Sequence, residues 1–251
     1  MEPHEYARMF ALEESYWWYR ALRRYIRQAL VRSGAFPRTP SATSPAGLDA
    51  GCGTGMLLAT WGDRVHGVGL DFSATALAGA RRRGLGRLMQ ASVEAIPLRS
   101  GAMDFIVSAD VLYHRGVRDD LAALREFQRC LRPGGVLVLN LPAYRWLRSA
   151  HDDAIHTERR YTAGEVRAKL RRAGLRPVRV RYWNWLCFPP IALVRLVRRR
   201  SRSGTGAPSS DLTPLPRGLN ALLDALLALE ARLAFLPAPA GLSVLAVARK
   251  E

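Results

Sequence analysis

The stretch LDAGCGTG, residues 48–55, follows a short apolar run and sets three glycines at alternate positions. We expect it to form the turn from a first strand into a first helix. Glycine lets a backbone approach a ligand closely, and the start of a helix offers unpaired N–H groups. The stretch therefore predicts a ligand site at this turn.

The segments around this turn alternate between strand and helix patterns. A strand–helix alternation of this kind predicts an α/β protein with a doubly wound, mostly parallel, seven-stranded Rossmann-like sheet. Ligands of such sheets bind at the carboxyl ends of the strands. The predicted strands are residues 47–50, 64–70, 87–91, 102–109, 135–141, 175–183 and 242–249, and the predicted helices are 54–61, 73–83, 119–131 and a capping-box helix ending at Gly174.

Two regions fall outside that alternation, and they divide the chain into three predicted parts. Residues 1–36 are predicted to form a helical lid, with an apolar side along residues 4–31. The sheet core would comprise residues 46–183 and 242–251. Residues 184–241 are too long for a plain connection and form a predicted helical insertion, either a substrate cap or a membrane-surface element. Its helices are expected at 191–200 and 219–236.

Composition limits the class of protein. The net charge is +17, but only Lys169 and Lys250 are lysines, so the charge reflects arginine usage and is a weak indication of a nucleic-acid partner. The three cysteines lie far apart without a CxxC pair, and the sequence has no secretory-signal pattern and no run of about 18 apolar residues. We therefore expect a cytoplasmic protein.

The acids around the glycine turn indicate which ligand binds. A dinucleotide fingerprint would need a glycine where Met56 stands, and a Walker loop would need Gly-Lys-Ser/Thr. Asp49 before the turn suits a ligand amine. Asp71, at the end of the second predicted strand, suits both hydroxyls of a ribose. An amine, a ribose and no phosphate describe S-adenosylmethionine, which is the predicted cofactor.

At these motifs the chain resembles the class I S-adenosylmethionine-dependent methyltransferases, over about residues 46–183 and the final strand. LDAGCGTG resembles their first motif, GLDFS the acidic second one, ASVEAIPL the adenine-holding stretch, and MDFIVSADVLYH and LRPGGVLVLNLP the later strand motifs. The resemblance implies a set of cofactor-binding residues: Tyr16, Asp49, Gly51, Cys52, Gly53, Gly55, Asp71, Phe72, Ser92, Val93 and Asp110.

One position departs from the family pattern, and two segments point to a subgroup. Ser92 stands where the family usually has an acid for the adenine amino group; serine can accept a hydrogen bond there without charge. The aromatic residues 16–20 and the stretch HDDAIHTERRYT resemble a subgroup related to the type 11 and type 23 methyltransferases. Its substrates are mostly unassigned and often linked with cell-surface glycan or lipid-carrier pathways. Tyr19 and Arg160 are its predicted substrate-binding residues.

Methyl transfer to a hydroxyl needs a base that removes the proton. The candidate catalytic residues are His114, His151, His156 and Tyr161, and the alternative for His114 is a role in capping a helix. Two histidines and two aspartates occur in residues 151–156, but their spacing does not place them on one helical face, so no metal site is predicted.

We therefore expect a transferase that methylates an oxygen atom of a small-molecule or lipid-linked acceptor. The alternatives are an RNA methyltransferase, disfavoured because residues 109–112 read ADVL in place of an N/D-P-P-Y/F tetrapeptide, and a non-transferring S-adenosylmethionine-binding protein. Arginines among apolar residues at 191–200 suit a helix on an anionic membrane surface, so peripheral association with the inner face of the membrane is a further expectation.

Overall fold

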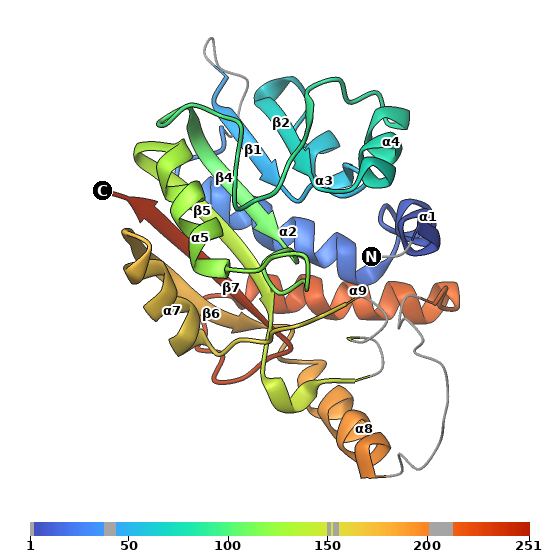
Figure 1. The fold of residues 1–251 in the computed structure, drawn as a ribbon. Helices are drawn as coiled ribbons and strands as arrows, with labels where there is room; N and C mark the ends of the chain where they lie inside the picture. The colour runs from blue at the N-terminus through green and yellow to red at the C-terminus, as the bar shows by residue number, and fades with distance from the viewer. Residues whose placement is uncertain (1–2, 38–43, 150–151, 153–155, 201–212) are drawn as a thin grey trace.

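A computed structural model describes residues 3–37, 44–149, 152, 156–200 and 213–251. Its centre is a seven-stranded sheet in the order β3-β2-β1-β4-β5-β7-β6, in which β7 alone runs antiparallel, to both β5 and β6 (Figure 1). The predicted fold class is confirmed. The strands are β1 (Ala46–Ala50), β2 (His66–Asp71), β3 (Leu88–Gln90), β4 (Met103–Ala109), β5 (Leu131–Pro142), β6 (Leu175–Trp183) and β7 (Ser243–Lys250).

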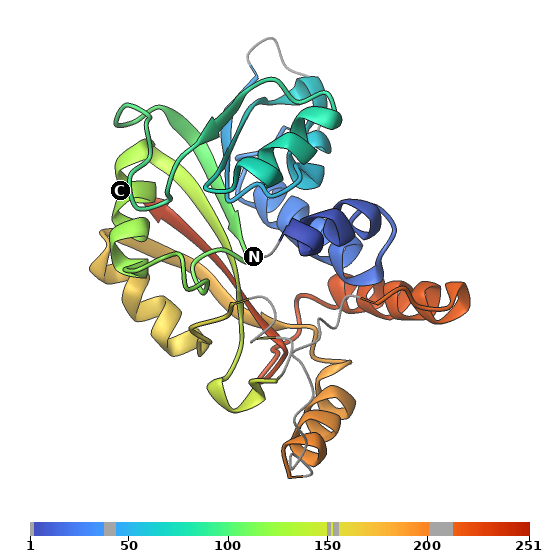
Figure 2. The same ribbon diagram turned by 45° about the vertical axis from the view of Figure 1, so that its right-hand side comes forward.

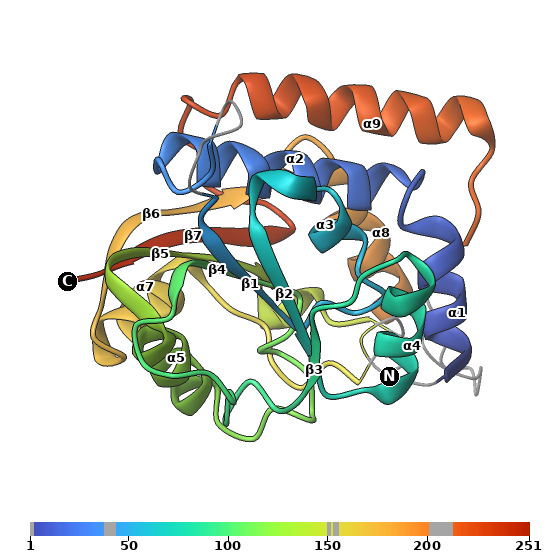
Figure 3. The same cartoon turned by 90° about the horizontal axis from the view of Figure 1, so that it is seen from above.

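Helices cover both faces of the sheet. On one face lie α5 (Asp120–Cys130) and α7 (Ala163–Arg172), while α2 (Trp17–Arg32) and α9 (Arg217–Arg232) lie side by side on the other (Figure 3). Each face has its own apolar core, because the central strands are buried on both sides. The remaining described elements are α1 (Pro3–Leu12), α3 (Met56–Ala59), η1 (Gly62–Arg64), α4 (Ala74–Arg82), η2 (Arg145–Leu147) and α8 (Phe188–Arg200).

The pairing of β1 brings the predicted ligand residues to one edge. Its carboxyl end pairs in parallel with β2, where Ala50 lies opposite Leu70, and with β4, where Asp49 lies opposite Val107. The carboxyl ends of β1, β2 and β4 therefore meet at the same edge of the sheet, where the glycine turn begins.

Several predicted elements have different bounds in the structure, and three of them matter most. The lead-in predicted over residues 4–31 is two helices, because the chain turns at residues 13–16 between α1 and α2. The helix predicted to reach Leu131 ends at Cys130, and β5 begins four residues before the predicted position 135. Pairing of Leu131 with Met103, before a register shift in the ladder, extends the strand past Pro133 and Gly134.

The insertion contains α8 and α9, and of these two helices only α9 packs along the sheet-covering helix α2. The carboxylate of Glu230 on α9 accepts hydrogen bonds from the Tyr25 hydroxyl (2.9 Å) and from the backbone N–H groups of Asn184 (2.6 Å) and Leu186 (3.0 Å). These bonds join α9 to α2 and to the end of β6, whereas α8 projects away from the sheet (Figures 1 and 2). Within the described ranges, no helix has the length and apolarity needed to cross a membrane.

Candidate active site

A cavity of about 1520 Å³ opens at the carboxyl edge of the sheet. Its wall is built from α1, α2, the glycine turn, the ends of β2 and β4, the segment after β5, and α8. Fourteen of the predicted site residues line it: Tyr16, Tyr19, Asp49, Gly51, Cys52, Gly53, Asp71, Phe72, Ser92, Val93, Asp110, His114, His156 and Arg160.

The glycines of the turn are needed for packing as well as for access. Gly51, at φ 87°, could not carry a Cβ without overlapping the side chain of Val111. At Gly53, at φ 55°, a Cβ would lie 2.8 Å from Met9 Cε of α1. Side chains rarely adopt these left-handed conformations, so the backbone favours glycine at both positions, and the contact with Val111 adds a steric requirement at Gly51.

Asp71 holds the turn in place. Its carboxylate accepts hydrogen bonds from the backbone N–H groups of Gly53 (2.9 Å) and Ser73 (2.8 Å). Burial nevertheless raises the pKa of this carboxyl above its ordinary value. Asp71 is therefore fixed against the glycine turn, where a ligand in the cavity can reach it.

Asp49 is a buried acid with an unpaired oxygen. The residue is 2% exposed, and its Oδ2 has no hydrogen-bond partner among the described atoms. Burial, together with the negative charges of Asp71 and Glu13, raises the pKa of Asp49 to about 8. A cationic amine next to this carboxylate would relieve both the burial cost and the repulsion.

Asp110 follows β4 in a left-handed backbone conformation, at φ 60°. Both of its carboxylate oxygens accept from the side-chain amide of Asn140, at 3.1 and 3.2 Å. Burial raises the pKa of Asp110 to about 7, although this amide opposes the shift. A group that titrates near neutrality thus lies in the cavity wall.

The helix α1 covers the glycine turn. The sequence pattern does not reveal this contact. Glu13, at the turn after α1, accepts hydrogen bonds from the Thr54 hydroxyl and from Arg83 Nη2 (2.8 Å). Tyr6 and Met9 join the cavity wall from the same helix. The apolar pattern of residues 4–31 indicated a buried face but could not identify its partner on the core.

The residues predicted for the adenine side differ in exposure. Phe72 is 77% exposed and lies at the cavity mouth, whereas Val93 is buried. The Ser92 hydroxyl accepts a hydrogen bond from the Glu94 backbone N–H at 3.1 Å. Ser92 is thus part of a local turn, and it lines the cavity.

Two of the predicted histidines lie together in the cavity wall. The His114 ring stacks on Tyr113 with ring centroids 4.5 Å apart, and residue 114 forms a β-bridge with Thr157, next to His156. His156 has a left-handed backbone, at φ 56°. His151 lies outside the described residues.

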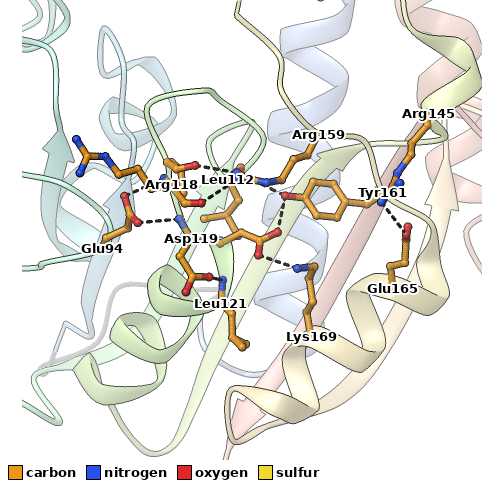
Figure 4. Close-up of polar contacts among 12 residues, drawn as sticks. Glu94, Leu112, Arg118, Asp119, Leu121, Arg145, Arg159, Tyr161, Glu165 and Lys169 are labelled. Atoms are coloured by element: carbon orange, nitrogen blue, oxygen red, sulfur yellow. Dashed lines mark hydrogen bonds and ion pairs between the residues drawn. The ribbon is translucent and has the colours of Figure 1, made fainter.

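Tyr161 and Gly55 are not among the residues that line the cavity, and their predicted roles stay predictions. The Tyr161 hydroxyl is buried against Asp120 Oδ2 (2.9 Å) and the Leu112 carbonyl oxygen (3.2 Å), in the network of Figure 4. Gly55 faces α4, where a Cβ would lie 2.5 Å from Leu85 Cδ1. Both residues serve packing, which their positions in the motifs did not reveal.

Arg160 lines the cavity as a buried ion-paired residue. Its Nε and Nη2 donate to the two oxygens of Asp152 at 2.7 and 3.0 Å, and its Nη1 donates to the Ala143 carbonyl oxygen at 2.8 Å. The sequence did not identify Asp152 as its partner, nor did it single out Thr157, Asn184 and Arg195, which are among the other residues of the wall. Among the described residues, no three His, Cys, Asp or Glu side chains group as a metal site would require.

The comparisons with known proteins bear on residues of the same region. A family described as "Methyltransferase domain" matches residues 48–139, which run from the glycine turn to β5. This segment holds the glycine turn, Asp71 and Asp110. It ends before Arg160, Asn184 and the insertion.

Several of the curated relatives carry the name malonyl-[acyl-carrier protein] O-methyltransferase, and another is a tRNA U34 carboxymethyltransferase of Trichlorobacter lovleyi, 34% identical over 104 residues, 37% of this chain and 30% of the relative. The chain is 38% identical to the O-methyltransferase from Enterobacter lignolyticus over 131 residues, which is 49% of this chain and 51% of the relative. It is 33% identical to the one from Geobacter sulfurreducens over 152 residues, 53% of this chain and 56% of the relative. The chain thus matches about half the length of these two O-methyltransferases.

A solved structure extends the comparison of the fold. A protein of Thermotoga maritima, described as an S-adenosylmethionine-dependent methyltransferase and possible histamine N-methyltransferase, superposes with a TM-score of 0.58 at 18% identity. The match covers 99% of this chain and 96% of that one. At this identity the likeness establishes the shared fold.

Proposed function

Since residues 48–139 make this chain a member of the class I S-adenosylmethionine-dependent methyltransferases, we propose that it methylates an oxygen of a small or lipid-linked acceptor. The observation that carries the proposal is the unpaired, buried Oδ2 of Asp49 beside Asp71 at the glycine turn. A ligand with one cationic amine and one ribose fits this pair of acids. A pyrophosphate would gain no cationic partner from this pair of acids.

Five residues of the cavity wall have a proposed part in holding the cofactor. Asp49 would pair with the amine, Asp71 would accept the ribose hydroxyls, and Phe72 would pack on the adenine. Gly51 and Gly53 leave the backbone bare at the turn. These roles agree with the orientation of the sheet edge, at which ligands of doubly wound folds bind.

When bound, S-adenosylmethionine supplies an electrophilic methyl group on a sulfonium leaving group. In the transfer the acceptor oxygen forms a bond to the methyl carbon, the carbon–sulfur bond breaks, and its electron pair stays on sulfur as a neutral thioether. The chain then has to align the acceptor and exclude water. A hydroxyl acceptor would also give up a proton, for which His114 and His156 are the described candidate bases, whereas a carboxylate acceptor needs no base.

The acceptor class rests on the O-methyltransferase relatives, whose name describes a carrier-linked acceptor. A small or lipid-linked acceptor is therefore the proposal for this chain, and a cytoplasmic setting is part of it. Incubation with S-adenosylmethionine labelled in the methyl group tests it against carboxylate, hydroxyl and RNA acceptors. Label in an ester or ether, with one S-adenosylhomocysteine formed per transfer, supports it. Label in RNA would favour the alternative transferase, and binding without any S-adenosylhomocysteine would favour a non-transferring protein.

A further inference from the structure

The charges that line the cavity differ between its two ends. Asp49 and Asp71 lie at the glycine turn. Four arginines line the cavity from η2, the segment after it and α8: Arg145, Arg148, Arg160 and Arg195. Among the described lining residues of those segments, Asp152 is the one acid.

Asp152 is flanked by two guanidinium groups. Arg160 is 8% exposed and bonds to both of its oxygens, while Arg195 reaches in from α8 and donates to the Leu147 carbonyl oxygen at 2.9 Å. Burial opposes ionisation, yet the hydrogen bonds of Arg160 and the charges of both arginines hold the pKa of Asp152 below its ordinary value. The carboxylate stays ionised, and among the described side chains of these segments two guanidinium groups flank this one carboxylate.

Two buried polar side chains in this wall lack partners. Asn184 is 1% exposed, and neither its Nδ2 nor its Oδ1 makes a hydrogen bond within the described structure. The Thr157 hydroxyl is likewise unpaired, in a residue 2% exposed. Both residues line the cavity. Leaving such groups unpaired is unfavourable, so a ligand that bonds to them is the simplest account of their retention.

The fold holds Asn184 in a strained conformation. Its backbone is left-handed, at φ 59°, and its N–H is fixed by Glu230 at 2.6 Å. Three of the four described non-glycine residues with positive φ line this cavity: Asp110, His156 and Asn184. Strain of this kind persists where the surrounding structure imposes it, and it concentrates at ligand sites.

We propose that Arg160, Arg195, Asn184 and Thr157 form an anion site that holds a carboxylate or phosphate group of the acceptor. Arg160 keeps its paired bonds to Asp152 and contributes its positive charge, while the guanidinium of Arg195, the amide and the hydroxyl would donate to the ligand oxygens. The proposal rests on the proposed function and adds the substrate class, an anionic acceptor. All four residues lie outside residues 48–139, so the part of the chain that the family match does not cover selects the acceptor.

Direct anion binding tests this site. The protein, saturated with S-adenosylhomocysteine, is titrated calorimetrically with malonate, inorganic phosphate and the neutral control malonamide. At least one anion should bind about tenfold or more tightly than malonamide, and the tighter of the two identifies the group. Arg195→Gln and Asn184→Asp should each weaken that binding about tenfold or more. Aspartate keeps the shape of asparagine and tolerates a left-handed backbone, but it repels an anion.

Arg167→Gln is the matched control, because Arg167 lies on α7 outside the cavity wall and donates to the Val180 carbonyl oxygen. It should bind anions like the wild type. Equal binding of malonamide and both anions, or unchanged binding in both test variants, would overturn the site. The affinity for S-adenosylhomocysteine is measured first. If the wild type does not bind S-adenosylhomocysteine, the proposed function is contradicted. The anion titration is then repeated without S-adenosylhomocysteine, and it still decides whether the anion site exists.

Discussion

Asn140 on β5 links the ends of β4 and β6: its side-chain amide donates to both oxygens of Asp110, at 3.1 and 3.2 Å, and its Oδ1 accepts from Trp183 Nε1 at 2.7 Å. Asp110 lies in the cavity wall, and Trp183 precedes Asn184. One fully buried amide therefore fixes the acid at one strand end relative to the proposed anion site at another.

Replacement of Asn140 tests this link. Asn140→Ala leaves the Trp183 N–H and a buried carboxylate without partners, so we expect a loss of about 2–4 kcal/mol in the free energy of unfolding. Ser108→Ala is the control, because Ser108 is buried in the neighbouring strand with an unpaired hydroxyl and should change stability by less than about 1 kcal/mol. Urea unfolding measures both. Similar losses in the two variants would show that the amide has no special part.

Cofactor binding should release a proton from Asp49. Without ligand its pKa is about 8, so at pH 7 most molecules carry the proton. An ammonium group beside it favours the carboxylate and lowers the pKa, so affinity for S-adenosylhomocysteine should rise with pH between about 6 and 8 and level off above. Calorimetry in buffers of different ionisation enthalpy counts the protons. Release should approach one at pH 7 and vanish in Asp49→Asn; undiminished release in this variant would point to another group.

Asp71 should contribute to affinity through its charge. Asp71→Ala removes the acceptor for the ribose hydroxyls and for the Gly53 N–H, which typically costs about 1.5–3 kcal/mol. We expect S-adenosylhomocysteine to bind roughly ten- to hundredfold more weakly, with the circular dichroism spectrum unchanged. Wild-type affinity in the variant would assign Asp71 to the structure of the turn alone.

The projecting helix α8 leads to a prediction about membranes. Leu193 and Val197 are 63% and 55% exposed on it, amid an arginine-rich sequence. An apolar face flanked by cations binds anionic bilayers, and salt screens the attraction. The protein should sediment with vesicles containing acidic lipid at low salt and be released at high salt. Leu193→Gln should reduce the binding, and failure to bind such vesicles at low salt would end this hypothesis.

The features that could be predicted from the sequence are those that local sequence patterns determine. The glycine turn at 51–55, the acids at the strand ends and the strand–helix alternation each follow from residues near one another in the chain, and the fold confirms the alternation. The contact of Glu13 with Thr54 and the environment of Asn184 depend on segments brought together only by folding. Tyr161 stood in a promising stretch, but its partner Asp120 is 41 residues away in the sequence.

The central claim is that the glycine turn and its two acids bind S-adenosylmethionine. Calorimetric titration with S-adenosylhomocysteine, NAD and ATP measures it directly, in the wild type and in Gly53→Val. We predict one molecule of S-adenosylhomocysteine per chain and far weaker binding of NAD and ATP. We expect no binding to Gly53→Val, because valine disfavours the left-handed backbone of this position and its side chain would occupy space at the turn. Equal binding of the three ligands, or unchanged affinity in Gly53→Val, would contradict the account.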